Sequence, residues 1–206
     1  MKVKKKTTVI EVREGNELVE ASFGLSSACL KTFDYICMLS NTREVKKNSD
    51  GDIWVDFDFK QYTSLMHVDP QGYYKKVREV LTKLQQCTFI YIDSNKKLHI
   101  TGLIKEAIYD TTDCFAKIQL SKNLIPFMCG LPNCSGNYTT YYLENIMSLE
   151  SKYAIRLYKI FKERYDKEIY LQDNRELEEK RYSPAILETD FELEEFVKML
   201  GLKYKI

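Results

Sequence analysis

The sequence predicts an α+β protein organised around a winged helix-turn-helix. Four stretches follow one another in the order that this motif needs: helices over 59–66 and 70–86, then strands over 89–92 and 98–104. A tight corner joins the two helices, and the loop Asp93 to Lys97 joins the strands as the tip of a wing would. A helix-turn-helix followed by a β-hairpin is a DNA-reading unit, so the order of elements points to nucleic-acid binding.

The composition is that of a globular protein of one or two domains. The chain has 206 residues, 44% of them apolar, and a formal net charge of +1. Any attraction for nucleic acid must therefore be local. Residues 71–86 provide it, with Lys75, Lys76, Arg78 and Lys83 against the single acid Glu79, and more lysines stand at positions 2, 4, 5 and 6. Such charge runs are also common on ordinary solvated surfaces.

Cysteine and histidine usage argues against a metal site or cofactor. Six cysteines occur without a Cys-x-x-Cys pair, and the two histidines, His67 and His99, are far apart in sequence. The sequence contains no signal peptide and no apolar run long enough to span a membrane. We therefore expect a cytoplasmic protein with reduced cysteines, no bound metal and no membrane contact.

The elements before the helix pair are ordinary ones. Residues 1–15 suit either a flexible basic arm or an edge strand. A helix with Ser26 or Ser27 at its N-cap follows. Residues 53–59 alternate apolar and polar side chains, which predicts a half-buried strand. The three aspartates of this region, Asp52, Asp56 and Asp58, are expected to face solvent rather than to hold a metal ion.

The second helix of the pair carries the candidate DNA-binding face. Asp69 suits its N-cap and Pro70 its first position. Its apolar residues form one stripe, made of Tyr73, Val77, Val80, Leu81 and Leu84. An amphipathic surface helix would show the same period, but the order of elements favours DNA, where long side chains reach phosphates and base edges. The predicted DNA-binding residues are Gln71, Tyr74, Lys75, Lys76, Arg78, Thr82 and Lys83 on the helix, with Lys96 and Lys97 on the wing.

The chain after the wing alternates further strands and helices. We expect a strand over 114–120, a short helix over 121–130 capped by Ser121, and a boundary over 131–137, where Pro, Gly, Asn and Ser cluster. A strand or extended segment over 138–143 then leads to a helix capped by Ser151.

The C-terminal part of the chain is predicted to hold two helices. The helix that Ser151 caps has one apolar face made of Tyr153, Ala154, Leu157, Tyr158 and Phe161. Residues 172–182 predict a loop. Thr189 and Glu192 suggest a capping box for a last helix, and Gly201 its end.

Four stretches together carry a resemblance to a known family. They are NELVEASFGLSS (16–27), SKNLIPFMCGL (121–131), SKYAIRLYKIF (151–161) and FELEEFVKMLGL (191–202). In this order and spacing they resemble the replication initiators of iteron-containing plasmids, which are built from two tandem winged-helix domains. The resemblance implies a protein that binds repeated double-stranded DNA at a plasmid origin, opens the adjacent DNA and recruits the host replicative helicase.

The resemblance also implies a domain organisation. The reading helix of the first domain is Pro70 to Gln86, and its wing is 93–97. The first winged-helix domain, over 16–132, is expected to bind DNA and to form homodimers. The second, over 138–206, is expected to be incomplete at its C-terminus, because the family continues there into another recognition helix and wing. The fold class expected is thus one complete winged-helix domain followed by a partial second one.

Other functions remain open to different degrees. The natural alternative is a winged-helix repressor or a dimerisation fragment of an initiator without initiation activity. A scaffold module without a DNA role is a further one. An enzyme is not expected, because the sequence lacks the histidine pair of a nickase, a G-x-x-x-x-G-K-[ST] loop and a G-x-S-x-G elbow.

Overall fold

The computed structural model describes residues 10–21, 23–41, 46–47, 51–92, 95–110, 115–131, 137–176 and 189–202, without the side chains at 46, 47, 71 and 171–176. The elements up to the wing are β1 (Glu11–Gly15), α1 (Asn16–Glu20), α2 (Ser27–Asn41), β2 (Lys46–Lys47), β3 (Ile53–Asp58), α3 (Phe59–Leu65), α4 (Pro70–Gln86), β4 (Thr88–Ile92) and β5 (Leu98–Gly102). The later elements are β6 (Ile104–Asp110), β7 (Phe115–Leu120), the 3-10 helix η1 (Lys122–Leu124), α5 (Ile125–Met128), β8 (Tyr138–Tyr142), α6 (Leu143–Ser148), α7 (Lys152–Glu176) and α8 (Leu193–Met199).

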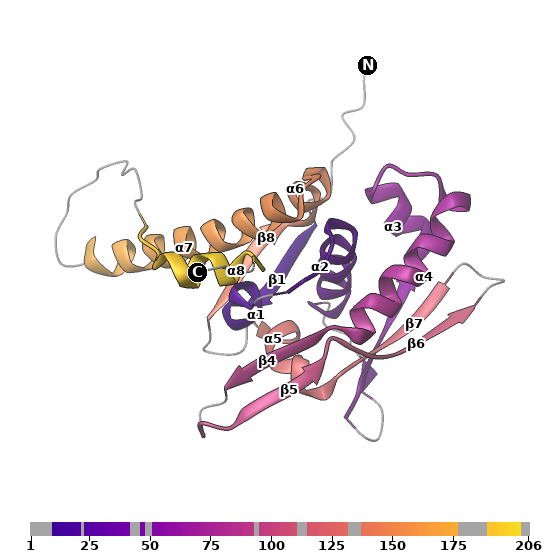
Figure 1. The fold of residues 1–206 in the computed structure, drawn as a ribbon, viewed down its shortest axis with the longest axis horizontal. Helices are drawn as coiled ribbons and strands as arrows, with labels where there is room; N and C mark the ends of the chain where they lie inside the picture. Colours follow the sequence, from indigo (N-terminus) through magenta and orange to yellow (C-terminus); the bar gives the residue numbers. More distant parts are fainter. Residues whose placement is uncertain are drawn as a thin grey trace, which may run out of the picture.

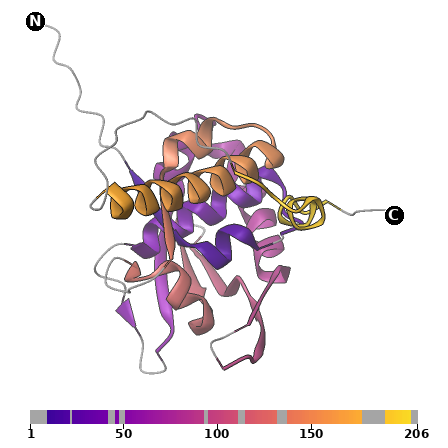
Figure 2. The ribbon, with the colours of Figure 1, turned by 90° about the vertical axis from the view of Figure 1, so that its left-hand side faces the viewer.

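Helix α2 lies in the middle of the molecule, between α7 on one side and the α3–α4 pair on the other (Figure 1). Within the described ranges the strands pair as a four-stranded sheet in the order β2-β3-β7-β6 and as two separate pairs, β1–β8 and β4–β5. Turned by 90°, α7 crosses the face of the molecule in front of α2 (Figure 2). The central helix is buried along most of its length, and its Tyr35 ring packs on Phe57 and Tyr62 at centroid distances of 5.0 and 5.1 Å.

Helices α3 and α4 form the predicted helix pair. The carboxylate of Asp58 accepts two backbone N–H groups from the first turn of α3, at 2.7 and 3.1 Å, and so begins that helix. At the other end of α3 the N–H of Val68 donates to the carbonyl of Thr63, with His67 in the left-handed region at φ 52°. Helix α4 begins at Pro70, as predicted.

The aspartates around β3 do not all face solvent, so that prediction is wrong. Asp56 is exposed, and Asp58 is half-buried as the cap of α3. Asp52 is buried, and its Oδ2 accepts hydrogen bonds from Lys105 Nζ at 2.8 Å and Gln119 Nε2 at 2.7 Å. These two donors satisfy a carboxylate that would otherwise be costly to bury.

The second strand of the wing is shorter than predicted. The expected strand 98–104 ends at Gly102, and the chain continues as β6, which pairs with β7 instead of β4. Leu103 at the break is fully buried, and its N–H donates to the carbonyl of Cys87 at 3.1 Å. Burial of this leucine turns the chain out of the hairpin and into the four-stranded sheet.

The strand and helix after β6 lie where the sequence placed them. Strand β7 begins at Phe115, and the helix expected over 121–130 is realised as η1 followed by α5. Ser121 is the N-cap residue, as predicted, but its hydroxyl makes no capping hydrogen bond, because it bonds to Thr101 Oγ1 at 2.6 Å instead.

The first strand of the described chain pairs with a strand far along the sequence, β8, in one small sheet. Of the arm-or-strand segment 1–15, residues 11–15 form strand β1, and residues 1–9 lie outside the described residues. Strand β1 pairs antiparallel with β8, with Val12 opposite Tyr141. Helix α6, which the sequence did not predict, follows β8. The segment after 137 is therefore joined to elements before 132, and the division of the chain into two winged-helix domains stays a prediction.

Helix α7 buries a different face from the predicted one. Tyr153 and Phe161 are exposed, at 38% and 47%, and the other three expected core residues are half-buried. The buried residues are Ile155, Arg156, Lys159, Ile160 and Glu163. Arg156 and Lys159 make internal contacts that a period of apolar residues cannot show. Arg156 donates to the carbonyls of Met199 and Ala21, and Lys159 meets two buried carboxylates.

The ends of α7 and α8 match the sequence in part. Ser151 caps α7, with its Oγ accepting the N–H of Tyr153 at 3.2 Å. The expected loop over 172–182 is wrong for residues 172–176, which continue α7, and residues 177–188 lie outside the described ones. The capping box is also wrong, because α8 begins after Glu192 without a side-chain cap. Gly201 ends α8 as predicted, at φ 68°.

Candidate nucleic-acid interface

The inner face of α4 is the stripe that the sequence predicted. Tyr73, Val77, Val80, Leu81 and Leu84 are all buried, and the helix packs against α2, α3 and β6. The ring of Tyr73 lies 5.9 Å from that of Tyr62, so this tyrosine packs inward. The orientation of α4 about its axis is fixed by this packing, which leaves its opposite face to solvent.

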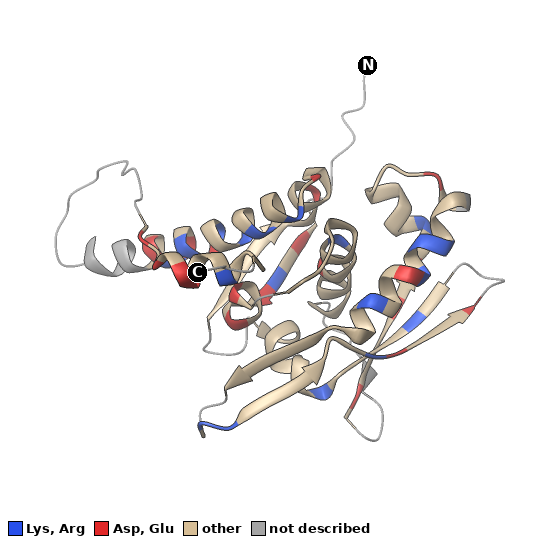
Figure 3. Ribbon diagram, in the orientation of Figure 1, with Lys and Arg blue, Asp and Glu red and all other residues tan. Residues whose placement is uncertain are grey.

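Basic residues are spread along α4 (Figure 3). The predicted residues Lys75, Lys76, Arg78, Thr82 and Lys83 are all exposed. Two of them are already engaged within the helix. Lys76 Nζ lies 5.4 Å from the centroid of the Tyr73 ring, and the hydroxyl of Thr82 donates to the backbone carbonyl of Arg78 at 2.9 Å. The structure thus brings a cluster of long basic side chains to one solvated helix face.

The two other predicted residues of α4 stand apart from that cluster. Tyr74 is half-buried, and its ring packs edge-on against Phe59 with centroids 5.3 Å apart. The side chain of Gln71 lies outside the described residues. Stacking of Tyr74 on DNA would require it to leave this aromatic contact.

The two lysines of the wing lie away from α4. Lys96 and Lys97 are exposed at the tip of the β4–β5 hairpin, which leads away from the C-terminal end of α4 (Figure 1). Lys96 is in the left-handed region at φ 61°. Residues 93–94 of the loop lie outside the described residues. The predicted residues therefore form two separate groups, one on the helix and one on the wing.

One face of the hairpin is apolar, which sequence reasoning missed. Ile90 lies opposite Ile100, and Ile92 opposite Leu98, and all four side chains are more than half exposed. The other face packs inward, with the Tyr91 and His99 rings stacked 4.7 Å apart. The signal was present in the sequence, since FIYI and LHI have no acidic residue, lysine or arginine on either face of the strand. We call these four side chains the hairpin patch.

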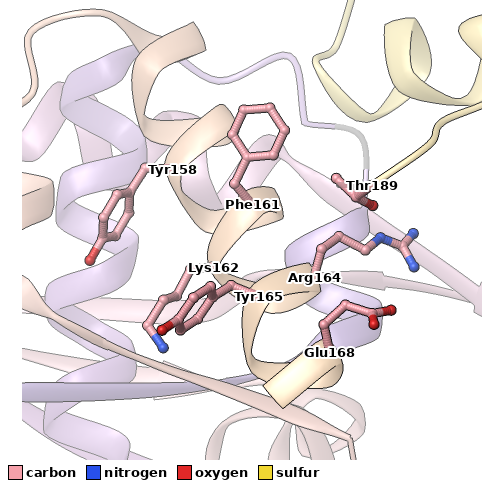
Figure 4. Close-up of a pocket in the computed structure, with 7 residues that line it drawn as sticks. All are labelled: Tyr158, Phe161, Lys162, Arg164, Tyr165, Glu168 and Thr189. Atoms are coloured by element: carbon pink, nitrogen blue, oxygen red, sulfur yellow. The ribbon is translucent and has the colours of Figure 1, made fainter. Parts of the chain in front are cut away.

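An open groove of about 580 Å³ runs beside α7 (Figure 4). It is lined by Tyr158, Phe161, Lys162, Arg164, Tyr165, Glu168 and Thr189. Its cations are paired, Lys162 with Asp166 and Arg164 with Glu20. The described residues contain no group of three or more His, Cys, Asp or Glu side chains that could hold a metal ion. No helix in the described part of the chain is both long and apolar enough to cross a membrane.

Comparison with known proteins identifies a matching family and a solved structure of the same fold. The sequence matches the family described as Initiator Replication protein, WH1, over residues 11–162. No curated protein matches the chain. A solved structure, the Pi initiator protein in complex with iteron DNA, superposes with a TM-score of 0.57 at 16% sequence identity, covering 79% of this chain and 66% of that one. At this identity the superposition shows a shared fold.

These findings confirm two predictions from the sequence, the winged-helix α+β fold and the resemblance to replication initiators. The matched region contains the helix pair, the wing and the β1–β8 pairing, and it ends inside α7. The chain belongs to the family of initiator replication proteins, whose WH1 winged-helix domain it carries over residues 11–162.

Proposed function

We propose that this chain acts as a plasmid replication initiator that binds repeated double-stranded DNA at its origin. The observation that carries the proposal is the exposed basic face of α4, held outward by a fully packed inner stripe within an initiator WH1 domain. A helix of this kind fits the major groove, with the wing on the backbone beside it. The fold is shared with an initiator that was solved on iteron DNA.

The same proposal extends to the surroundings of the protein. Plasmids replicate in the cytoplasm, so we propose that the chain is cytoplasmic. We propose the host replicative helicase and the host initiator as its protein partners. Family membership supports these two partners.

The test is binding of the 206-residue chain to the DNA upstream of its own gene, measured by fluorescence anisotropy over a range of salt. Scrambled DNA of equal length is the control. We expect a clear preference for the upstream DNA, because contacts from α4 to base edges add to those with phosphates. Equal and steeply salt-dependent binding to both DNAs would contradict recognition of a specific origin.

A second candidate function is that of a repressor or dimerisation fragment without initiation activity. The hairpin patch favours it. The β4–β5 pair has no further strand beside it among the described residues, and its exposed aliphatic face is a surface that another chain can cover. We propose that a second copy of this chain covers it, giving a homodimer through the first domain. An origin-opening assay with the purified chain separates the two functions, since only the initiator melts the adjacent DNA.

The dimer proposal predicts that Ile90→Lys combined with Ile100→Lys makes the chain monomeric. These two residues are directly opposed at the centre of the patch. Burial of such side chains contributes about 1.5–3 kcal/mol each, so the dimer dissociation constant should rise roughly a hundredfold or more. Analytical ultracentrifugation measures it. Ile108→Lys is the matched control, because Ile108 is an isoleucine exposed to 49% on β6, outside the hairpin. If Ile108→Lys dissociated the dimer and the hairpin variant did not, the interface would lie outside the hairpin patch.

The wing predicts a different effect on DNA. Lys96→Ala combined with Lys97→Ala should weaken binding about equally on upstream and scrambled DNA, because both lysines are exposed at a tip that suits phosphate contacts. The slope of binding against salt should fall by about one for each phosphate that is no longer bound. Anisotropy titrations measure both quantities. A change in the preferred sequence would show that the wing reads bases.

A further inference from the structure

A cluster of buried charges joins α7 to the elements on which it packs. Lys159 on α7 lies 2.5 Å from Glu14 Oε2 on β1 and 2.8 Å from Asp34 Oδ1 on α2. The hydroxyl of Tyr141 on β8 lies 2.8 Å from the same Glu14 oxygen and 2.9 Å from the same Asp34 oxygen. All four side chains are at most 1% exposed. Each comes from a different element, so the cluster is the polar junction of α2, β1, β8 and α7.

One cation contacts the two carboxylates of this cluster, and a second, Arg156, acts on them through its charge without a hydrogen bond to either. Two carboxylates face one ammonium group, and the one hydroxyl of Tyr141 carries a single proton for two acceptors. The remaining oxygens, Glu14 Oε1 and Asp34 Oδ2, are buried and have no hydrogen-bond partner among the described residues. A proton on one carboxylate would remove the repulsion between the two and turn one of these oxygens into a hydrogen-bond donor.

Asp34 is the group suited to carry that proton. Burial, reinforced by the repulsion of Glu14, raises the pKa of Asp34 to about 6 against the opposing effect of Lys159. The pKa of Lys159 is also raised, because its two carboxylates outweigh the effect of burial. A group with this balance changes its protonation between acidic and neutral pH.

The thiol, phenol and guanidinium groups near the cluster do not titrate in this range. Burial also raises the pKa of Glu163 on α7, whose carboxylate contacts Asn16 and Arg164. Burial and the nearby carboxylates raise the pKa of Cys37 on α2 well above its ordinary value, and Cys129 adds to that rise. Burial likewise raises the pKa of Tyr141. Arg156 on α7 has its pKa lowered by burial, yet as a guanidinium it stays charged and donates to backbone carbonyls.

We propose that Glu14, Asp34, Tyr141 and Lys159 form a proton-operated latch that holds α7 tightly on α2 and β1 when Asp34 is protonated and loosens α7 when Asp34 is ionised. The latch gives the domain two states, a single rigid unit and a unit in which α7 opens locally while the helix pair and the wing stay folded.

The direction of the pH dependence follows from the protons bound. The closed state holds the Asp34 proton up to about pH 6, whereas a solvated aspartate loses it near pH 4, so the closed state is favoured at low pH. Between pH 5 and pH 7.5 the opening equilibrium of α7 should increase roughly tenfold. Above this range Asp34 is ionised in both states, and the opening equilibrium levels off.

The experiment is hydrogen exchange of the full chain, followed by mass spectrometry at pH 5 and pH 7.5, with rates corrected by an unstructured reference peptide. We expect protection of α7 to fall roughly tenfold at the higher pH while α4 and β3 keep theirs. Asp34→Asn cannot ionise, so its α7 protection should be the same at both pH values. Asp56→Asn, an exposed aspartate of β3, should behave as the wild type.

Two results would overturn the latch. One is an equal pH dependence of α7 protection in the wild type and Asp34→Asn. The other is a wild-type α7 that loses protection only together with α4, which would show global unfolding. If Asp34→Asn does not fold, the wild-type comparison of α7 with α4 still decides between a latch and no latch.

Discussion

Replacing Lys159 with alanine is expected to lower the free energy of unfolding by about 3–5 kcal/mol at neutral pH. The Lys159 side chain is 1% exposed and contacts both Glu14 and Asp34, so its removal leaves two buried carboxylates without the cation that touches them. Because the pKa of Lys159 is raised in the folded protein, its stabilising charge is complete at neutral pH and fades only above the lysine range. Urea denaturation followed by circular dichroism measures the change.

The control for this variant is Lys167→Ala on the same helix, which removes an exposed lysine and should change stability by less than about 0.5 kcal/mol. The loss of stability in Lys159→Ala should be smaller at pH 5, since Asp34 then carries a proton and is no longer a buried negative charge. Adding Asp34→Asn should likewise recover part of the stability at neutral pH. A decrease below about 1 kcal/mol would show that the carboxylates reach water once the lysine is gone.

Features set by residues close together in the sequence were predicted correctly, and features set by residues far apart were not. The faces of α4 follow from a local period of apolar residues, and Tyr73 and Leu84 are buried as expected. The ends of helices also follow from local chemistry where Ser151 and Gly201 act. The break after Gly102 could not be predicted, because an apolar residue such as Leu103 can continue a strand as well as end one, and only its burial in the structure marks the break.

The junction of α7 shows where sequence patterns mislead. Lys159 and Arg156 belong to residue types that are seldom fully buried without partners, so a helical period assigns them to solvent. Their partners, Glu14 and Asp34 for the lysine and two carbonyls for the arginine, lie far away in the chain. Only the tertiary structure shows them, and the same holds for the pairing of β1 with β8.

The candidate interface could be predicted on α4, where a local period decides which side chains are exposed, but not on the hairpin. Exposure of Lys75 and Arg78 follows from the period of the stripe on the opposite face. The hairpin patch was not predicted, because an apolar strand sequence indicates a buried strand unless the neighbouring strands are known.

Lys75→Ala combined with Arg78→Ala is expected to lower affinity for the upstream DNA by about thirtyfold or more. Both side chains lie on the solvated face of α4, and base contacts are worth about 1–3 kcal/mol each. Thermal stability should stay within about 0.5 kcal/mol of the wild type, because neither side chain is buried. Fluorescence anisotropy and thermal unfolding together measure the two effects. Lys122→Ala combined with Lys167→Ala, two exposed lysines outside α4, is the control of equal charge.

The salt dependence of this double variant separates two kinds of DNA contact. If both residues bind phosphates, affinity falls alike on upstream and scrambled DNA, and the salt slope decreases by about two. If Arg78 reads a base edge, the preference for upstream DNA falls while the slope changes by about one at most. A decrease in stability with unchanged binding would mean that α4 presents the opposite face to DNA. The inner stripe makes that arrangement costly, because exposing Val77 and Leu84 would forfeit about 1.5–3 kcal/mol for each side chain.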